Sequence, residues 1–280
     1  MRNLLSANFY RLVRSKVFYA GLLAAAGVEI YTLLSDYRGI LNWKGGLEEA
    51  FFFYPMLVVL AMPAFCGIYL GAEYADGTLR SKVAAGIPRW KIYTANLIIA
   101  AAVSLALSTV GILAGLALGL PLVGGFHLSA QTLVAYLVCS CVVGVAAASF
   151  STMLALLVPN RAVGLVVGIL LTFALLFVGQ SLMTTLMEPE LVQESTQIVE
   201  NGQVAYLTEY GAPMVPNPDY IQGIPRMLCT FFLYFLPTSQ CFTVAFTAMD
   251  FPGLLLALGA LFTLLTTAVG LGLFVRKDVK

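Results

Sequence analysis

Charge is scarce in this sequence of 280 residues, because only 10% of them are Asp, Glu, Lys or Arg. Soluble globular domains normally carry about 25% charged residues. Hydrophobic residues make up 60% of the chain, and its mean hydropathy is +0.91. This composition excludes a soluble domain and indicates an integral membrane protein.

Nucleotide-binding and metal-binding motifs are also missing. The sequence has no Gly-Lys dipeptide and therefore lacks the phosphate-binding loop G-x-x-x-x-G-K-[ST]. A single histidine excludes H-E-x-x-H and other paired-histidine metal sites. We therefore expect a chain that is not an enzyme and binds no cofactor itself. Any ATP energy must come from a partner, and we expect no nucleic-acid partner.

Long uncharged runs predict the membrane spans. Most exceed the roughly 20 residues that a helix needs to cross about 30 Å of hydrocarbon. The runs are residues 17–28, 50–72, 92–126, 128–160, 162–187, 227–249 and 251–275. The first reaches adequate length when it is extended to Leu34. Pro237 interrupts the sixth run, so residues 227–250 are predicted to form a re-entrant helical hairpin. The fold predicted is an all-α membrane protein, a single transmembrane domain of residues 1–280 with six spans.

Basic residues set the predicted orientation. With six spans, twelve of them fall on one side of the membrane and three on the other. The larger group is Arg2, Arg11, Arg14, Lys16, Arg80, Lys82, Arg89, Lys91, Arg161, Arg276, Lys277 and Lys280. The smaller group is Arg38, Lys44 and Arg226. Because positive charge favours the cytoplasmic side, both termini are predicted to be cytoplasmic.

Residues 1–16 are predicted to form an interfacial helix, because apolar and basic side chains fall on different faces. A plain basic flank is the alternative interpretation. The apolar face holds Leu5, Phe9, Leu12 and Val13. The polar residues of the helix, Arg2, Asn3, Arg11 and Arg14, lie off this face.

Residues 188–226 form the predicted extracellular loop, which is rich in acidic residues. Within it, residues 195–200 and 203–208 flank Asn201-Gly202, a dipeptide that favours a tight β-hairpin turn. The prolines after this hairpin keep the chain extended until it re-enters the membrane. The sequence leaves open whether the acidic loop recognises a cation and whether Cys229 pairs with Cys241.

Inside the predicted spans, Glu29 is the one carboxylate. Burying a charge at the middle of a span costs about 2.5–3.5 kcal/mol. A structural role and a substrate contact both remain open for it. Gly111, Gly115 and Gly119 repeat every four residues, a spacing that lets helices approach closely, more often within one protomer than between two.

Residues 73–91 are the most strongly charged interior stretch. Glu73 ends the second span, Gly77-Thr78-Leu79-Arg80 follows, and Gly86-Ile87-Pro88-Arg89 leads into the third span. This order resembles the permease subunits of ATP-binding-cassette (ABC) type-2 exporters. The likeness extends to the six spans, the N-terminal helix and the outer hairpin before the last span.

The resemblance implies a permease of a bacterial plasma membrane that dimerises with a second copy or a paralogue. It also implies separate ABC ATPase subunits, which bind ATP and Mg²⁺ and dock on a coupling helix within residues 73–91. Asp76 and Arg80, four residues apart, are expected to lie on that helix. The residues expected to serve the coupling are Glu73, Asp76, Gly77, Thr78, Leu79, Arg80, Lys82 and Arg89.

In this family the pathway runs along the dimer interface, between the second and fifth spans. Carried over by span, the candidates are Phe53, Met56, Met62, Phe65, Phe173, Phe177 and Gln180. Glu29 of the first span is a further candidate, because it is a carboxylate inside a span. Apolar, Met-rich walls suit export of a hydrophobic or amphipathic cargo such as a drug, a lipid or an antimicrobial peptide. The alternatives are an ion-coupled secondary carrier and a non-transporting immunity or binding component.

Overall fold

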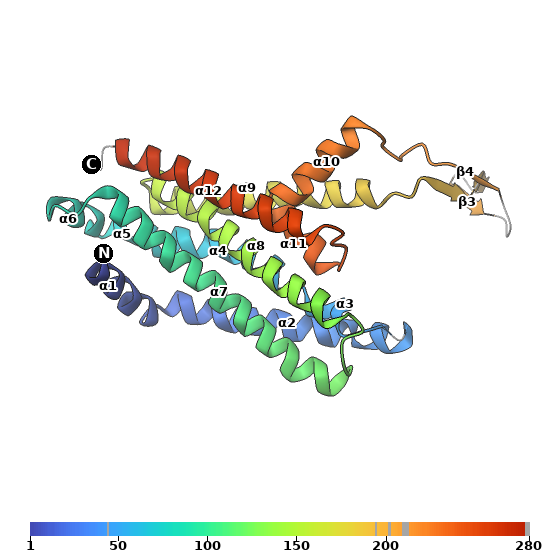
Figure 1. Cartoon of the computed structure of the whole chain (residues 1–280), viewed down its shortest axis with the longest axis horizontal. Helices are drawn as coiled ribbons and strands as arrows, with labels where there is room; N and C mark the ends of the chain where they lie inside the picture. Colours follow the sequence, from blue (N-terminus) through green and yellow to red (C-terminus); the bar gives the residue numbers. More distant parts are fainter. Residues whose placement is uncertain (44, 194, 201–202, 209–212, 278–280) are drawn as a thin grey trace.

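The computed structural model describes residues 1–43, 45–193, 195–200, 203–208 and 213–277. The chain forms an elongated bundle of helices with short strands at one end (Figure 1). Both described ends of the chain lie at the opposite end, beside the short helix α6 (Thr78–Ala84). These two ends of the molecule are called the strand end and the α6 end below.

Six long apolar segments in the described part of the chain are able to cross a membrane, as predicted. The shortest has 25 residues, which corresponds to about 37 Å of helix. The single helices among them are α2 (Lys16–Trp43), α7 (Arg89–Leu122), α8 (Ala130–Leu157), α9 (Arg161–Met187) and α12 (Pro252–Arg276). Successive spans run in opposite directions, so an even number of crossings returns the chain to the α6 end (Figure 1).

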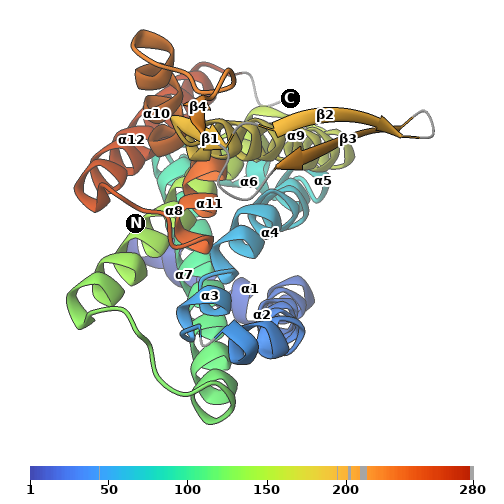
Figure 2. The same ribbon diagram turned by 90° about the vertical axis from the view of Figure 1, so that its right-hand side faces the viewer.

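The second span is divided into three helices: α3 (Glu48–Phe51), α4 (Tyr54–Tyr69) and α5 (Gly71–Ala75). It is the most buried of the six, and α4 packs against α2, α7, α8 and α9. Figure 2 shows α4 in the middle of the end-on view. The second span is therefore the central element around which the other spans pack.

The glycines of α7 make room for this central span. A Cβ atom added at Gly111 would lie 2.6 Å from Tyr54 Cβ, and one at Gly115 would lie 2.8 Å from Phe51 Cδ2. One at Gly119 would lie 2.3 Å from the side chain of Leu47. The expected packing within one protomer is confirmed, because all three glycines meet side chains of the same chain.

Between α9 and the last span, α10 (Ile224–Phe235) and α11 (Pro237–Ala245) meet at an angle of 90°. The bend falls at Pro237, as predicted, because proline begins a helix readily but disrupts a helix interior. All nine residues of α11 are buried, among α4, α8 and α9. Cys229 and Cys241 are both free, so the disulfide that the sequence left open is not formed.

At the strand end, β2 (Ser195–Glu200) and β3 (Gln203–Thr208) pair antiparallel over the predicted residues. Their Asn201-Gly202 turn lies outside the described residues. A second pair, β1 (Leu191–Gln193) with β4 (Met214–Pro216), closes the base of the loop. Figure 2 shows β2 and β3 extending away from the helices.

Candidate functional site

The charged segment 73–91 reverses direction at the α6 end. Gly77 has φ +67°, a left-handed conformation that favours glycine, and it separates α5 from α6. Asp76 directly follows α5 whereas Arg80 lies in α6, so the prediction that these two residues share a helix is wrong. No ion pair joins them in the described structure. The glycine that makes the turn also breaks the helix.

Helix α6 is held by one fully buried residue, Leu79, and its other side faces outward. Arg80, Ser81 and Ala84 are exposed there. A second left-handed glycine, Gly86, follows the end of α6, and Pro88 directly precedes α7. The segment therefore presents a compact helical surface beyond the ends of the spans.

The predicted ATPase contact requires that the side chain of Glu73 face outward, and in the structure it faces inward. Its side chain is fully buried, and its Oε1 lies 2.6 Å from Lys82 Nζ and 2.8 Å from Arg11 Nη2. Asn96 Nδ2 donates a hydrogen bond of 3.2 Å to its other oxygen, Oε2. Burying a carboxylate is costly unless it is paired and hydrogen-bonded, and Glu73 has both kinds of partner.

This Glu73 cluster joins five elements: α4, α5, α6, α7 and α1 (Arg2–Val13). Asn8 Nδ2 donates to Asn96 Oδ1 at 3.1 Å, and the Tyr69 hydroxyl donates to the Asn8 carbonyl at 2.9 Å. The Arg11 guanidinium also lies 4.1 Å from the centre of the Tyr69 ring. The N-terminal helix is thus anchored to the bundle through polar contacts, which its predicted basic face did not reveal.

The sequence reasoning missed Asn8, Tyr69 and Asn96. Asn96 carried a usable signal, because a lone amide inside an uncharged run needs hydrogen-bond partners. Its partner Asn8 lies 88 residues earlier in the chain. No sequence spacing specifies a contact of that separation.

Arg89, another predicted ATPase contact, binds the chain's own C-terminal region. Its Nη1 donates to the Val275 carbonyl at 2.8 Å and also to the Lys277 carbonyl. Lys277 Nζ in turn donates to the Leu157 carbonyl at 2.9 Å and to the Tyr74 hydroxyl at 3.1 Å. Partial burial lowers the pKa of Lys277. The charged segment 73–91 is therefore tied to α8 and α12 as well as to α1.

The candidate pathway residues separate into two groups. Met56, Phe173, Phe177 and Gln180 line one groove of about 240 Å³, the α4–α9 groove, with Leu176 and Phe242. Phe173 and Phe177 are 47% and 75% exposed.

The other candidates lie elsewhere. Met62 and Phe65 belong to the buried core, where Phe65 stacks on Tyr69, and Phe53 packs edge-to-face on Phe246. Glu29 is fully buried beside Gly115 and Phe51, and neither carboxylate oxygen has a hydrogen-bond partner within the described residues.

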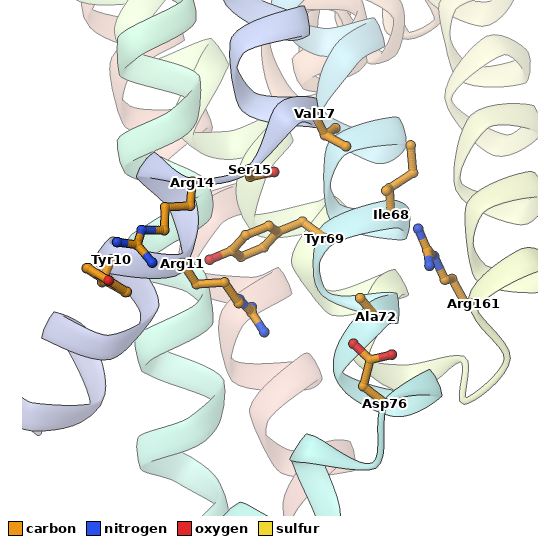
Figure 3. A pocket seen from close by; sticks show the side chains of 10 residues that line it. All are labelled: Tyr10, Arg11, Arg14, Ser15, Val17, Ile68, Tyr69, Ala72, Asp76 and Arg161. Atoms are coloured by element: carbon orange, nitrogen blue, oxygen red, sulfur yellow. The ribbon is translucent and has the colours of Figure 1, made fainter.

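A second hollow, of about 460 Å³, lies at the α6 end and was not predicted. Figure 3 shows Arg11 of α1 and Arg14, which directly follows α1, on one side and Arg161 at the start of α9 on the other. We call it the arginine pocket. Its lining is Tyr10, Arg11, Arg14, Ser15, Val17, Ile68, Tyr69, Ala72, Asp76 and Arg161.

The geometry defines a class of protein: a multi-pass helical membrane protein that holds a short helix firmly at one end of its spans. The chain belongs to the ABC-2 family, because the model described as ABC-2 family transporter protein matches residues 4–179. The match runs from α1 into α9. No curated protein and no solved structure matches the chain.

Family membership makes the chain the membrane component of an ABC transporter. Permeases of this family are typically not catalytic themselves, and they generally pair with an ABC ATPase subunit. The family predicted from residues 73–91 is therefore confirmed.

Proposed function

We propose that this chain is the permease subunit of an ATP-driven exporter in a bacterial plasma membrane. Helix α6 is its coupling helix, and it contacts a separately encoded ABC ATPase that binds ATP and Mg²⁺. The α6 end faces the cytoplasm, in agreement with its excess of basic residues. Both termini are then cytoplasmic, and the strand end is outside.

The observation that carries this proposal is the way α6 is held. Its inner side is fixed by Leu79 and by the ion pair of Lys82 with buried Glu73, while Arg80, Ser81 and Ala84 stay exposed. A protruding helix that is fixed at its base can transmit a movement of a docked subunit to the spans. The movement would reach α1 and α7 through the Glu73 cluster, and the central second span through α5.

The exposed apolar wall of α9 supports a pathway formed by two protomers. Phe173 and Phe177 border the α4–α9 groove and point away from the protomer core. A second copy or a paralogue covering this wall would enclose an apolar route between two access states. Such a route suits a hydrophobic or amphipathic cargo such as a drug, a lipid or a peptide. The α10–α11 pair is the outer re-entrant hairpin in this arrangement.

The test is affinity purification of the tagged chain from its native membrane in mild detergent. The measured quantities are the amount of ABC ATPase that co-purifies and the ATP turnover of the complex. We expect stoichiometric ATPase with the unaltered chain and loss of capture with Arg80→Glu, which reverses a charge on the exposed side of α6. Arg2→Glu is the matched control, because Arg2 is also exposed at the α6 end but lies in α1.

Glu73→Gln adds a second comparison. Its uncharged side chain leaves the outer surface of α6 unchanged, so we expect ATPase to be captured but turnover to respond less to cargo. The absence of an ABC ATPase with the unaltered chain in several mild detergents would contradict the proposal. Uptake or efflux driven by an ion gradient alone would then favour a secondary carrier.

A further inference from the structure

The arginine pocket lies at the level where several spans leave the membrane. Val17 is the second residue of α2, Arg161 is the first of α9, and Asp76 directly follows the second span. Lipid phosphates occupy this level in a bilayer, where basic pockets between helices bind anionic headgroups. The position of the pocket therefore follows from the span boundaries and does not depend on an ATPase partner.

The charge of the pocket suits an anion. Three arginines line it against one carboxylate, that of Asp76. Arg11 is already paired with Glu73, whereas Arg14 and Arg161 have no ion pair in the described structure. Arg14 lies 4.1 Å over the ring of Tyr10, which orients its guanidinium. Guanidinium groups bind phosphate through two parallel hydrogen bonds, so these arginines are suited to a phosphodiester.

The guanidinium of Arg11 has an unsatisfied hydrogen-bond donor. Its Nε is buried and has no hydrogen-bond partner within the described residues. A buried donor without a partner costs free energy until a ligand or water accepts its hydrogen bond. Figure 3 shows the side chain of Arg11 beside Tyr69 on the pocket wall.

An apolar groove continues from the pocket into the membrane. It has a volume of about 220 Å³, runs between α2 and α4, and shares Val17 and Ile68 with the arginine pocket. Ala20, Gly21 and Ala64 leave space along it because their side chains are small. A charged pocket beside an apolar groove matches the headgroup and the acyl chain of a phospholipid.

We propose that the arginine pocket binds the headgroup of an anionic phospholipid of the leaflet at the α6 end, with one acyl chain along the α2–α4 groove. The lipid would bridge α1 and α9 through Arg14 and Arg161. It would also lie next to the Glu73 cluster, since Arg11 and Tyr69 belong to both. The lipid composition of the membrane would then influence how firmly α1 is held against α6, the coupling helix of the proposed function.

The experiment is a titration of the detergent-purified chain with phosphatidylglycerol, monitored by native mass spectrometry, with phosphatidylcholine and inorganic phosphate as parallel ligands. We expect saturable binding of phosphatidylglycerol, and binding at least roughly 10-fold weaker in Arg14→Gln/Arg161→Gln. The matched control is Arg2→Gln/Arg276→Gln, which removes two exposed charges at the same end outside the pocket. This control should bind as the unaltered chain does.

Several outcomes would overturn the proposal. Equal weakening in the control variant would indicate diffuse attraction to the whole basic end. Equal affinity for phosphatidylcholine would remove the role of the arginines, and phosphate binding as tight as lipid binding would indicate a soluble anion. Displacement of the lipid when the chain dimerises would show that a second copy covers the pocket. Unfolding temperatures of both variants in lipid-free detergent, expected to match, establish that each is folded.

Discussion

Among the residues that the structure describes, the side chains of two glutamates are fully buried, and their surroundings differ completely. Glu73 at the α6 end has Arg11, Lys82 and Asn96 around its carboxylate. Glu29 between α2 and α7 has no hydrogen-bond partner in the described part of the chain. The comparison teaches that burial alone does not tell how an acid is held in the fold. Glu73 joins four elements through two ion pairs and a hydrogen bond, whereas the carboxylate of Glu29 lies beside Gly115.

The largest expected effect comes from removing the charge of Glu73. Glu73→Gln keeps the side-chain volume but leaves Lys82 and Arg11 without their counter-ion. A broken buried pair costs about 3–5 kcal/mol. Arg11 is partly exposed and water screens it, so we expect a loss of about 2 kcal/mol of stability. Thermal unfolding in detergent measures it.

A second variant checks the cause of that loss. Adding Lys82→Met to Glu73→Gln removes one of the two cations that have lost their counter-ion. The double variant should therefore lose less stability than the sum of the losses in the two single variants. Strict additivity of the two losses would mean that the pair does not interact energetically in the folded state.

Overpacking at Gly115 should have the next largest effect. In Gly115→Ala the new Cβ would lie 2.8 Å from Phe51 Cδ2 and 3.0 Å from Glu29 Oε1. Overpacking of this kind costs about 1–3 kcal/mol. Gly272→Ala in α12 is the control, because nothing lies within 4 Å of its Cβ position. Equal unfolding temperatures for the two variants would show that α7 does not pack on the second span in this way.

Lys277 should give a smaller, pH-dependent effect. Burial lowers its pKa in the folded state, so the unfolded chain binds more protons as the pH approaches the ordinary value of 10.5. The stability of the unaltered chain relative to Lys277→Met should therefore rise with pH in this alkaline range. Unfolding temperatures across the range measure the slope, and a slope of the opposite sign would show that Lys277 keeps its charge through favourable contacts.

The smallest effect is expected at Glu29. Glu29→Gln has nearly the same shape and breaks no ion pair or hydrogen bond of the described structure, so we expect a stability change within about 1 kcal/mol. If this variant lost as much stability as Glu73→Gln, Glu29 would have a charged partner in the working protein. The contrast between the two acids would then fail.

The sequence predicted the elements of this fold better than their contacts. The long uncharged runs correctly predict the six spans, and Pro237 correctly predicts the bend between α10 and α11. The strands β2 and β3 also occur at the predicted residues. Each of these features depends on residues close together in the chain. The break at Gly77 is local as well, since glycine favours a turn there, although the four-residue spacing of Asp76 and Arg80 predicts one helix across it.

The site was less predictable because its contacts join distant residues. Glu73 faces Arg11 from α1, and Arg89 faces the carbonyl of Val275, 186 residues later in the chain. Charged residues in a loop usually face solvent, so the sequence favoured an outward orientation for both. Only the packing of α1 and α12 against the central spans reveals that these charges bind within the chain.

The most direct test of the account is a cross-link from α6 to its partner in intact membranes. Ala84→Cys places a thiol on the exposed side of α6, and Ser35→Cys places one on the exposed surface of α2 toward the strand end. With a short bifunctional thiol reagent, we predict that Ala84→Cys captures an ABC ATPase and Ser35→Cys captures none. Capture of the ATPase by Ser35→Cys but not by Ala84→Cys would contradict the assignment of α6 as the coupling helix.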